Sequence, residues 1–383
     1  MDKKINIGLF NDSFFPMIDG VVMVVDNYAK RLSQYANVFV FVPSTDKNYD
    51  DSKFNYKVIR CNSVKMPFLD YSLPLPTFDK NFKKTLDACQ LDIVHIHAPA
   101  PIGIAGIKYA KKHHIPVVGT MHAQYQQDFK RALKSDYMAS DLAKKITNVY
   151  KKCDEVWAVN EAVADILTNE YGYDQKPRIM YNATEMKPVD KKEACDYVND
   201  KYHLSKDDNV FLFVGRINKL KNIFFIVDAL KELDMPYKML FVGDGQDMDE
   251  LKEYVKENNL ENVIFCGKIT DRKILAYYYA RADLFLFPSL YDCNSLVQIE
   301  AASQKTPTLF LEGAATASGI KSDINGFLSP NDPKAYAKKI KDVMENTDLY
   351  DNVCNNAYKT VYKNWDDVTK EVLELYKKLI EEK

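Results

Sequence analysis

Two carboxylates, Asp292 and Glu300, lie eight residues apart in a stretch that is typical of a strand, a loop and a helix. Ligands of parallel α/β proteins bind at the carboxyl ends of strands, and backbone N–H groups at the start of the next helix suit a phosphate. A carboxylate inside that helix can accept hydrogen bonds from sugar hydroxyls, so the pattern fits a sugar nucleotide. The alternative is two solvated acids beside a helix start, where the helix dipole favours negative charge. The backbone groups expected at the start of the helix belong to Ser295, Leu296 and Val297.

Two basic residues follow another apolar run. Arg216 comes directly after the run Asn209–Gly215, and Lys221 follows five residues later. Arginine offers a planar fork for phosphate oxygens and lysine a mobile point charge, so the pair suits the charge that develops on a departing diphosphate. The alternative is a pair of solvated surface cations, because lysine is abundant in this chain.

Histidines end two of the expected strands. His95 and His97 alternate on one face of a strand without a third ligand, so we expect no metal site and a structural role for His95. His122 follows the next strand, at the end where a ligand would bind.

Composition and missing motifs exclude several classes of protein. The formal charge of −2 argues against nucleic acid as a partner. No G-x-G-x-x-G follows the first strand, and the P-loop and G-x-S-x-G motifs are absent. Seven cysteines without a C-x-x-C predict buried thiols in a reducing compartment, and neither a disulfide set nor a zinc site. Without an apparent leader or spanning stretch, we expect a cytoplasmic protein.

Strand-like and helix-like runs alternate through the whole chain of 383 residues, which predicts an α/β fold of two domains. The strands are almost continuously apolar, as in parallel sheets that are buried on both faces. We expect an N-terminal domain over residues 1–185, a C-terminal domain over 186–362 and a final helix over 363–383. The expected strands are Ile5–Phe10, Val38–Val42, Tyr56–Arg60, Ile93–His97, Pro116–Thr120, Glu155–Val159 and Arg178–Tyr181, then Asn209–Gly215, Lys238–Gly243, Val263–Gly267, Leu284–Phe287 and Pro307–Leu311.

The stretch from Asp292 to Ala301 resembles the E-x7-E signature of retaining family-4 glycosyltransferases, which belong to the GT-B group. Arg216 and Lys221 resemble the arginine and lysine of the phosphate-binding motif that follows a strand and a glycine in that family, and the resemblance covers essentially the whole chain. It is closest to the diacylglycerol glycosyltransferase branch. It implies two Rossmann-like domains whose parallel sheets face each other across a cleft, with the last helix crossing back to the N-terminal domain. The segments nearest to that branch are Asn11–Pro16, His95–His97 and Thr120–His122.

The resemblance also implies roles for single residues. Glu300 would bind the nucleotide ribose, whereas Asp292 and His122 would contact the donor sugar. Arg216 and Lys221 would hold the diphosphate, so that no metal or other cofactor is needed. Retaining enzymes of this group are thought to lack a protein nucleophile, and the departing phosphate would take the acceptor proton. Residues expected to lie near the donor or the acceptor are Gly20, Gly215, Gly243 and Lys268; ordinary turn glycines are the alternative for Gly20 and Gly243.

The sequence departs from the family pattern at several positions. Asp292 replaces a glutamate, Asn294 an aromatic residue, and Ser295 and Ala183 each replace a glycine. A non-catalytic GT-B partner subunit would show such changes. The presence of Arg216, Lys221 and Glu300 argues against that interpretation.

The substrates are predicted less narrowly. We expect UDP-glucose as the donor, with GDP-mannose second, and a membrane lipid such as diacylglycerol as the acceptor. The alternatives are capsule, exopolysaccharide or lipid-linked glycan synthesis, a soluble acceptor, and a nucleotide-sugar epimerase of the same fold.

Two features suggest peripheral binding to an anionic membrane surface. Between Lys108 and Lys152 there are ten Lys and Arg residues against three Asp and Glu residues. An apolar segment is expected to dip into the interface, and the alternative is a solvated helical face with a folded loop. The residues of that segment are Phe68, Leu69, Tyr71 and Leu73.

Overall fold

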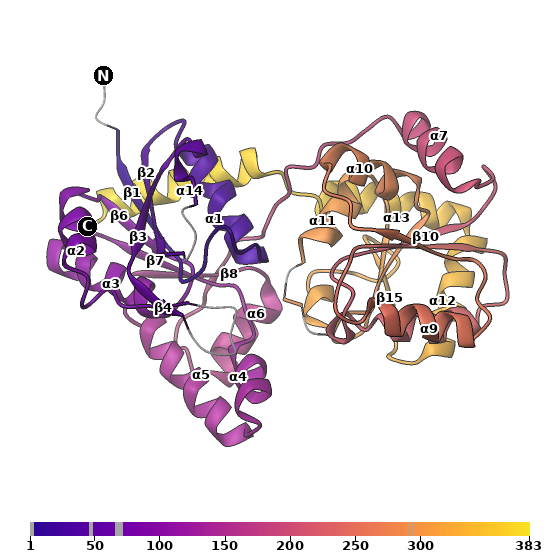
Figure 1. The fold of residues 1–383 in the computed structure, drawn as a ribbon, viewed down its shortest axis with the longest axis horizontal. Helices are drawn as coiled ribbons and strands as arrows, with labels where there is room; N and C mark the ends of the chain where they lie inside the picture. The colour runs from indigo at the N-terminus through magenta and orange to yellow at the C-terminus, as the bar shows by residue number, and fades with distance from the viewer. Residues whose placement is uncertain (1–3, 46–48, 66–71, 291, 294) are drawn as a thin grey trace. The chain divides into compact units, whose positions relative to one another are not determined.

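The computed structural model describes residues 4–45, 49–65, 72–290, 292–293 and 295–383. The chain divides into two compact units. The first holds residues 1–182 together with 365–383, and the second holds residues 183–364. Each unit contains its own parallel sheet with helices packed on it (Figure 1), so the two predicted Rossmann-like domains are confirmed.

The first unit contains a parallel sheet of seven strands in the order β3-β2-β1-β6-β7-β8-β9. Its central strands are buried on both faces, which explains their continuous apolar sequences. The antiparallel pair of β4 (Ser63–Lys65) and β5 (Ser72–Pro74) was not predicted, because neither three-residue strand has a readable period. The sheet strands are β1 (Asn6–Phe10), β2 (Asn37–Pro43), β3 (Lys57–Cys61), β6 (Ile93–Ile96), β7 (Val117–Met121), β8 (Glu155–Ala158) and β9 (Arg178–Ile179). The α-helices are α1 (Gly20–Leu32), α2 (Lys80–Ala88), α3 (Pro101–His113), α4 (Tyr125–Leu133), α5 (Asp136–Tyr150), α6 (Glu161–Asp165) and α14 (Trp365–Glu381).

The second unit contains a parallel sheet of six strands in the order β12-β11-β10-β13-β14-β15. The sequence analysis did not predict its edge strand β15, which is only three residues long. The strands are β10 (Val210–Val214), β11 (Lys238–Val242), β12 (Val263–Gly267), β13 (Leu284–Phe287), β14 (Thr308–Leu311) and β15 (Phe327–Ser329). The α-helices are α7 (Lys191–Tyr202), α8 (Ile223–Lys231), α9 (Met248–Glu257), α10 (Arg272–Arg281), α11 (Leu296–Ser303), α12 (Pro333–Glu345) and α13 (Thr347–Thr360).

The C-terminal helix α14 packs on the first unit, beside α1 (Figure 1), although the second unit precedes it in the sequence. Trp365 meets Tyr28 of α1 edge-on, with ring centroids 5.4 Å apart. Asp366 accepts a hydrogen bond from Arg31 Nε at 2.8 Å. The apolar face of α14 is therefore part of the core of the first unit.

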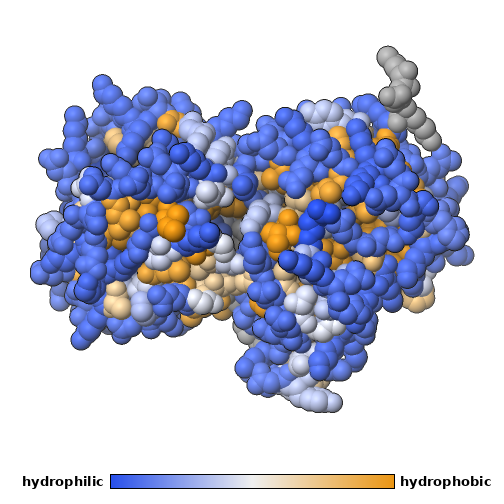
Figure 2. All heavy atoms as spheres, turned by 180° about the vertical axis from the view of Figure 1, so that it is seen from behind, coloured by the Kyte–Doolittle hydropathy of each residue, from blue (hydrophilic) through white to orange (hydrophobic). Residues whose placement is uncertain are grey.

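The surface is largely hydrophilic, and hydrophobic side chains reach it in separate patches (Figure 2). None of the helices in the described part of the chain has both the length and the apolar character that crossing a membrane requires. All seven cysteines are free thiols. Four are buried, as expected, whereas Cys153, Cys195 and Cys266 are only partly buried.

Candidate functional site

The loop after β10 carries two of the predicted cations. The buried strand ends at Val214, and Gly215 and Arg216 follow at its carboxyl end. Arg216 is exposed, and its guanidinium forms no ion pair with the residues that the structure describes. Lys221 ends a 3₁₀ turn (Lys219–Lys221), whose first turn is capped by the Asn218 side chain.

Lys221 and Asp292 contact each other directly, although they are 71 residues apart in the sequence. Lys221 Nζ lies 2.5 and 2.6 Å from the two Asp292 carboxylate oxygens. Strands β10 and β13 are parallel neighbours, so the loops at their carboxyl ends meet. The hydroxyl of Ser289 donates a third hydrogen bond to Asp292 at 2.7 Å. We expected Lys221 to meet phosphate and Asp292 to meet sugar, whereas the structure pairs them with each other.

Glu300 lies inside α11 and is 5% exposed. Arg272 Nη2 donates to its Oε1 at 2.5 Å, and the Tyr279 hydroxyl donates to its Oε2 at 3.1 Å. Burial raises the pKa of the Glu300 carboxyl, and the positive charge of Arg272 opposes that rise. A carboxylate has about four acceptor positions, so two remain for ligand hydroxyls. The sequence analysis missed Arg272 and Tyr279, since no motif signals which face of α10 meets α11.

The Gly243-Asp244-Gly245 turn packs backbone against backbone. Gly243 has a φ of +147°, and a Cβ atom on it would lie 1.8 Å from the carbonyl oxygen of Gly215. A Cβ atom on Gly245 would lie 2.2 Å from the carbonyl oxygen of Ile217. Glycine is therefore sterically required at both positions, which a plain turn would not demand.

A pocket of about 610 Å³ opens at the carboxyl ends of β10, β11 and β12. Its volume lies within the range of about 300–1,000 Å³ that is typical of small-molecule sites. Two exposed cations line it, Arg216 and Lys268, together with backbone of the glycine turn. The predicted site residues that the structure brings together here are Gly215, Arg216, Gly243 and Lys268.

Helix α11 begins shortly after Asp292. Ser295 is its N-cap residue with extended backbone, and among the described residues no side chain caps the helix. The first helical residues are Leu296 and Val297, and Asn294 lies outside the described residues.

The remaining predicted residues, His122 and Gly20, belong to the first unit. His122 Nε2 lies 3.1 Å from His97 Nδ1, so a third imidazole does stand beside the pair that we expected to be alone. The two ring nitrogens of His95 contact Tyr376 Oη at 2.5 Å and Thr120 Oγ1 at 2.7 Å, which confirms its structural role. Among the described residues, no group of three or more His, Cys, Asp or Glu side chains is arranged to hold a metal ion.

The three imidazoles are neutral. Burial lowers the pKa of His122 to about 3, and it lowers the pKa values of His95 and His97 well below their ordinary range. His97 Nε2 is buried without a partner in the described part of the chain. A bare acceptor nitrogen costs less there than an unpaired N–H donor, so the proton of His97 is favoured on Nδ1. His97 then donates to His122 Nε2, which leaves His122 with its proton on Nδ1.

The first loop is organised by two caps rather than by its glycine. Asp19 caps α1 through the backbone N–H of Val22 at 2.8 Å. Asp12 accepts from the backbone N–H of Ile102 at 3.0 Å, at the start of α3, and burial raises its pKa to about 7. A Cβ atom on Gly20 would meet nothing within 4 Å, so the protein alone does not require glycine there.

Two family models match the chain. The model for group 1 glycosyl transferases matches residues 198–360, and the model for glycosyltransferase family 4 matches residues 18–187. An alpha-monoglucosyldiacylglycerol synthase of Acholeplasma laidlawii is 27% identical over 368 residues, which cover 92% of this chain and 91% of that protein. The synthase of the same name from Streptococcus pneumoniae is 28% identical over 319 residues, covering 79% and 70% of the two chains.

Solved structures share the fold. A sucrose-phosphate synthase from Thermosynechococcus elongatus superposes with a TM-score of 0.81 at 20% identity, covering 99% of this chain and 100% of its own. HepE from Anabaena, solved with UDP-glucose, superposes with a TM-score of 0.75 at 16% identity, covering 97% and 99%. At such identities the likeness concerns the fold alone.

Proposed function

Because the chain belongs to the group 1 glycosyltransferases of GT-B fold, we propose that it transfers a hexose from a nucleotide sugar to a lipid or glycan acceptor, with retention at the anomeric carbon. The observation that carries the proposal is the pocket at the carboxyl ends of β10, β11 and β12. Arg216 lines this pocket and forms no ion pair with any described carboxylate. An arginine without an ion pair at such a site suits a diphosphate.

In this mechanism the protein positions the donor and stabilises charge. Arg216 and Lys221 bind the diphosphate as the glycosidic bond breaks, and Glu300 binds the ribose. Asp292 and His122 bind hydroxyls of the sugar, and the neutral His122 donates through Nδ1–H. The departing phosphate takes the proton of the acceptor hydroxyl on the same face of the sugar. No metal ion takes part in the proposed reaction.

We propose UDP-glucose as the donor, with GDP-mannose second. Relatives named as glucosyldiacylglycerol synthases and the neighbour solved with UDP-glucose support this order. The same relatives support diacylglycerol or a related membrane lipid as the acceptor. The enzyme would then act as a peripheral protein on the cytoplasmic face of the membrane.

The acids already counted against the basic excess pair with lysines of the same segment. Lys130 pairs with Asp136 at 2.7 Å and Lys145 with Asp141 at 2.7 Å on α4 and α5, and the excess itself keeps its size. Of the expected apolar segment, Leu73 is partly exposed on β5, and Phe68, Leu69 and Tyr71 lie outside the described residues.

The substitution Arg216→Ala tests the proposal, because the exposed side chain has no described partner whose loss would disturb folding. We expect the variant to lose about 100-fold or more in the rate of glucose transfer from UDP-glucose to diacylglycerol in vesicles. Lys252→Ala, which changes another cation of the same unit outside the pocket, is the control. Equal rates in both variants, or no stabilisation of the wild type by any nucleotide sugar in a thermal-shift screen, would refute the proposal and favour the non-catalytic partner subunit.

A further inference from the structure

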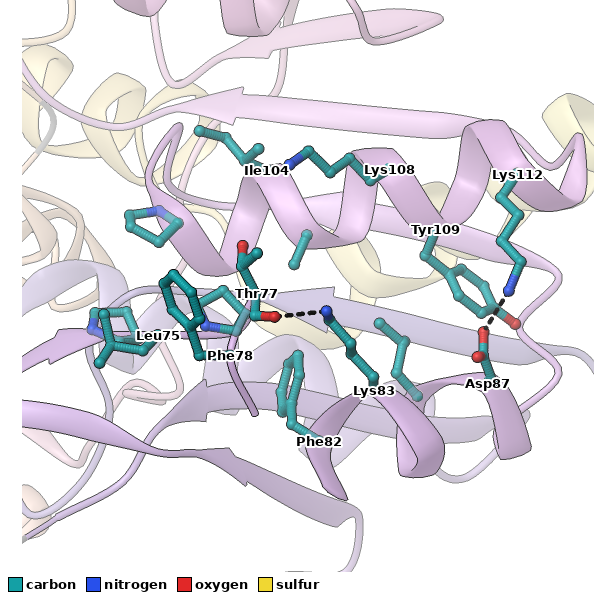
Figure 3. A pocket seen from close by; sticks show the side chains of 15 residues that line it. Leu75, Thr77, Phe78, Phe82, Lys83, Asp87, Ile104, Lys108, Tyr109 and Lys112 are labelled. Carbon is teal, nitrogen blue, oxygen red and sulfur yellow. Dashed lines mark hydrogen bonds and ion pairs between the residues drawn. The ribbon is translucent and has the colours of Figure 1, made fainter. Parts of the chain in front are cut away.

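A groove of about 460 Å³ runs between α2 and α3 of the first unit (Figure 3). Phe82 and Leu86 of α2 and Tyr109 of α3 are buried in its floor, and Ala105 of α3 also lines it. Pro74 and Pro76, in the segment before α2, also line the groove. None of its described lining residues has a buried side-chain polar atom without a partner. An occupant therefore needs no hydrogen-bonding groups, which an extended peptide would have to satisfy.

The rim of the groove is cationic. Three lysines line it, against a single carboxylate, Asp87. Lys112 pairs with Asp87 at 3.2 Å, and Lys83 donates to the carbonyl oxygen of Thr77 at 2.5 Å (Figure 3). Lys108 is exposed and forms no ion pair with any residue that the structure describes. The lysine stems extend the apolar wall and keep the charges in water.

Phe78, which is 81% exposed, lies at the end of the groove where Lys83 reaches Thr77, and Lys112 lies at the opposite end (Figure 3). An exposed aromatic ring next to lysines is typical of surfaces that sit in the interface of an anionic membrane. The apolar floor suits the acyl chain of an anionic lipid, and the cationic rim suits its head group. The exposed ring suits the interface between the two.

We propose that the groove between α2 and α3 binds one acyl chain of an anionic membrane lipid, with the lipid head group at Lys108 and its neighbouring lysines. This site belongs to the first unit and is separate from the donor pocket of the second unit. It would anchor the protein on a membrane whether or not the proposed transfer reaction is correct.

The experiment measures contact with acyl chains directly. Both native tryptophans, Trp157 and Trp365, are buried, so Phe78→Trp adds the one tryptophan that can meet a lipid. We expect its fluorescence to be quenched by phosphatidylglycerol vesicles with brominated acyl chains, and not by phosphatidylcholine vesicles of the same kind. Ala105→Phe, added to this variant, should abolish the quenching by filling the groove.

The charge of the rim is tested by a matched pair in the same Phe78→Trp background. Lys108→Glu should weaken vesicle binding by about tenfold or more, since each basic residue near an anionic surface contributes about fivefold and the reversal removes two charges. Lys84→Glu makes the same change on α2 outside the groove and should weaken binding by less than about threefold. The comparison of Lys108→Glu with Lys84→Glu tests the lipid site even if Ala105→Phe fails to fold. Circular dichroism would show whether that variant is folded.

Three results would overturn the proposal. One is equal loss of binding in Lys108→Glu and Lys84→Glu, which would indicate attraction without a site. Another is unchanged quenching in a folded Ala105→Phe variant. The third is absence of vesicle binding by a protein that still binds a monomeric fatty acid or a second copy of itself. None of these readouts uses the transferase activity, so failure here is distinguishable from failure of the proposed function.

Discussion

The ion pair between Lys221 and Asp292 competes with binding of the donor. In the proposed mechanism Lys221 binds the diphosphate and Asp292 binds the sugar, so the pair must open before either contact forms. Asp292→Asn should release Lys221 and raise the affinity for UDP by up to about fivefold, which is the value of a partly exposed pair. The transfer rate should fall about 100-fold, since the charged contact with the sugar is lost. Titration calorimetry with UDP, together with a transfer assay, separates the two effects.

Ser289→Ala is the control for this change, because it removes one hydrogen bond to Asp292 and keeps both charges. UDP should bind this variant as it binds the wild type. Equal UDP affinity in the wild type and Asp292→Asn would show that the pair opens without cost, and would contradict the expected competition.

The buried imidazoles should make the first unit sensitive to acid. The pKa of His122 is about 3 in the folded protein and about 6.5 in an unfolded chain. The unfolded state therefore binds more protons below pH 6.5, and the free energy of unfolding falls as the pH falls. His122 alone should remove about 2 kcal/mol between pH 7 and pH 5, and the lowered pKa values of His95 and His97 act in the same direction.

Urea unfolding followed by tryptophan fluorescence measures this loss, because Trp157 and Trp365 both belong to the first unit. On going from pH 7 to pH 5, His122→Gln should lose about 2 kcal/mol less stability than the wild type. The difference between the two proteins is the test, because Asp12, whose pKa burial raises to about 7, adds stability as the pH falls in both of them. An equal change in both proteins would mean that the His122 ring is not held neutral.

At the scale of elements, the turn after β11 is held by a glycine that no other residue can replace. Gly243→Ala should destabilise the second unit by about 3 kcal/mol or more, because the new Cβ would collide with the Gly215 carbonyl. Gly313→Ala is the matched control, since Gly313 also has a positive φ, of +76°, but open space around it. It should cost about 1 kcal/mol in chemical denaturation followed by circular dichroism. Similar losses in both variants would mean that the turn relaxes freely.

The elements that could be predicted from the sequence are those whose burial shows as a run of consecutive apolar residues. The strand β10 is five apolar residues buried on both faces, and each of the twelve expected strands is present. The missed strands β4, β5 and β15 have three residues each, too few to show a period.

The candidate site was predictable to the same degree. Arg216 lies two residues after the end of β10 and Asp292 five residues after the end of β13, so their place at the sheet edge follows from the local pattern. The pairing of Lys221 with Asp292, and of Arg272 with Glu300, depends on side chains that meet only when β10, β13, α10 and α11 have packed. The two contacts join residues that are 71 and 28 positions apart, and no local sequence pattern predicts them.

At the scale of the whole molecule, α14 joins the end of the chain to the unit that is made first. Trp365, Val372 and Tyr376 are almost completely buried in that unit. Each such side chain contributes about 1.5–3 kcal/mol when it is buried, and a domain is stable by only about 5–15 kcal/mol in total. Periodicity in the sequence predicts the helix, and the family resemblance implied that it crosses back to the N-terminal domain. Its packing on α1 shows which side chains join it to that unit.

Deletion of residues 365–383 should therefore unfold the first unit while the second unit, residues 183–364, stays folded. Loss of the Trp157 fluorescence transition, with a remaining cooperative transition in circular dichroism, is the expected signature. A synthetic peptide of residues 365–383 should restore the Trp157 transition, and the same peptide with Trp365→Ala and Tyr376→Ala should not, because it lacks the buried rings. Equal destabilisation of both units by the deletion would instead mean that α14 serves the two together, and that the division of the chain into units does not describe its unfolding.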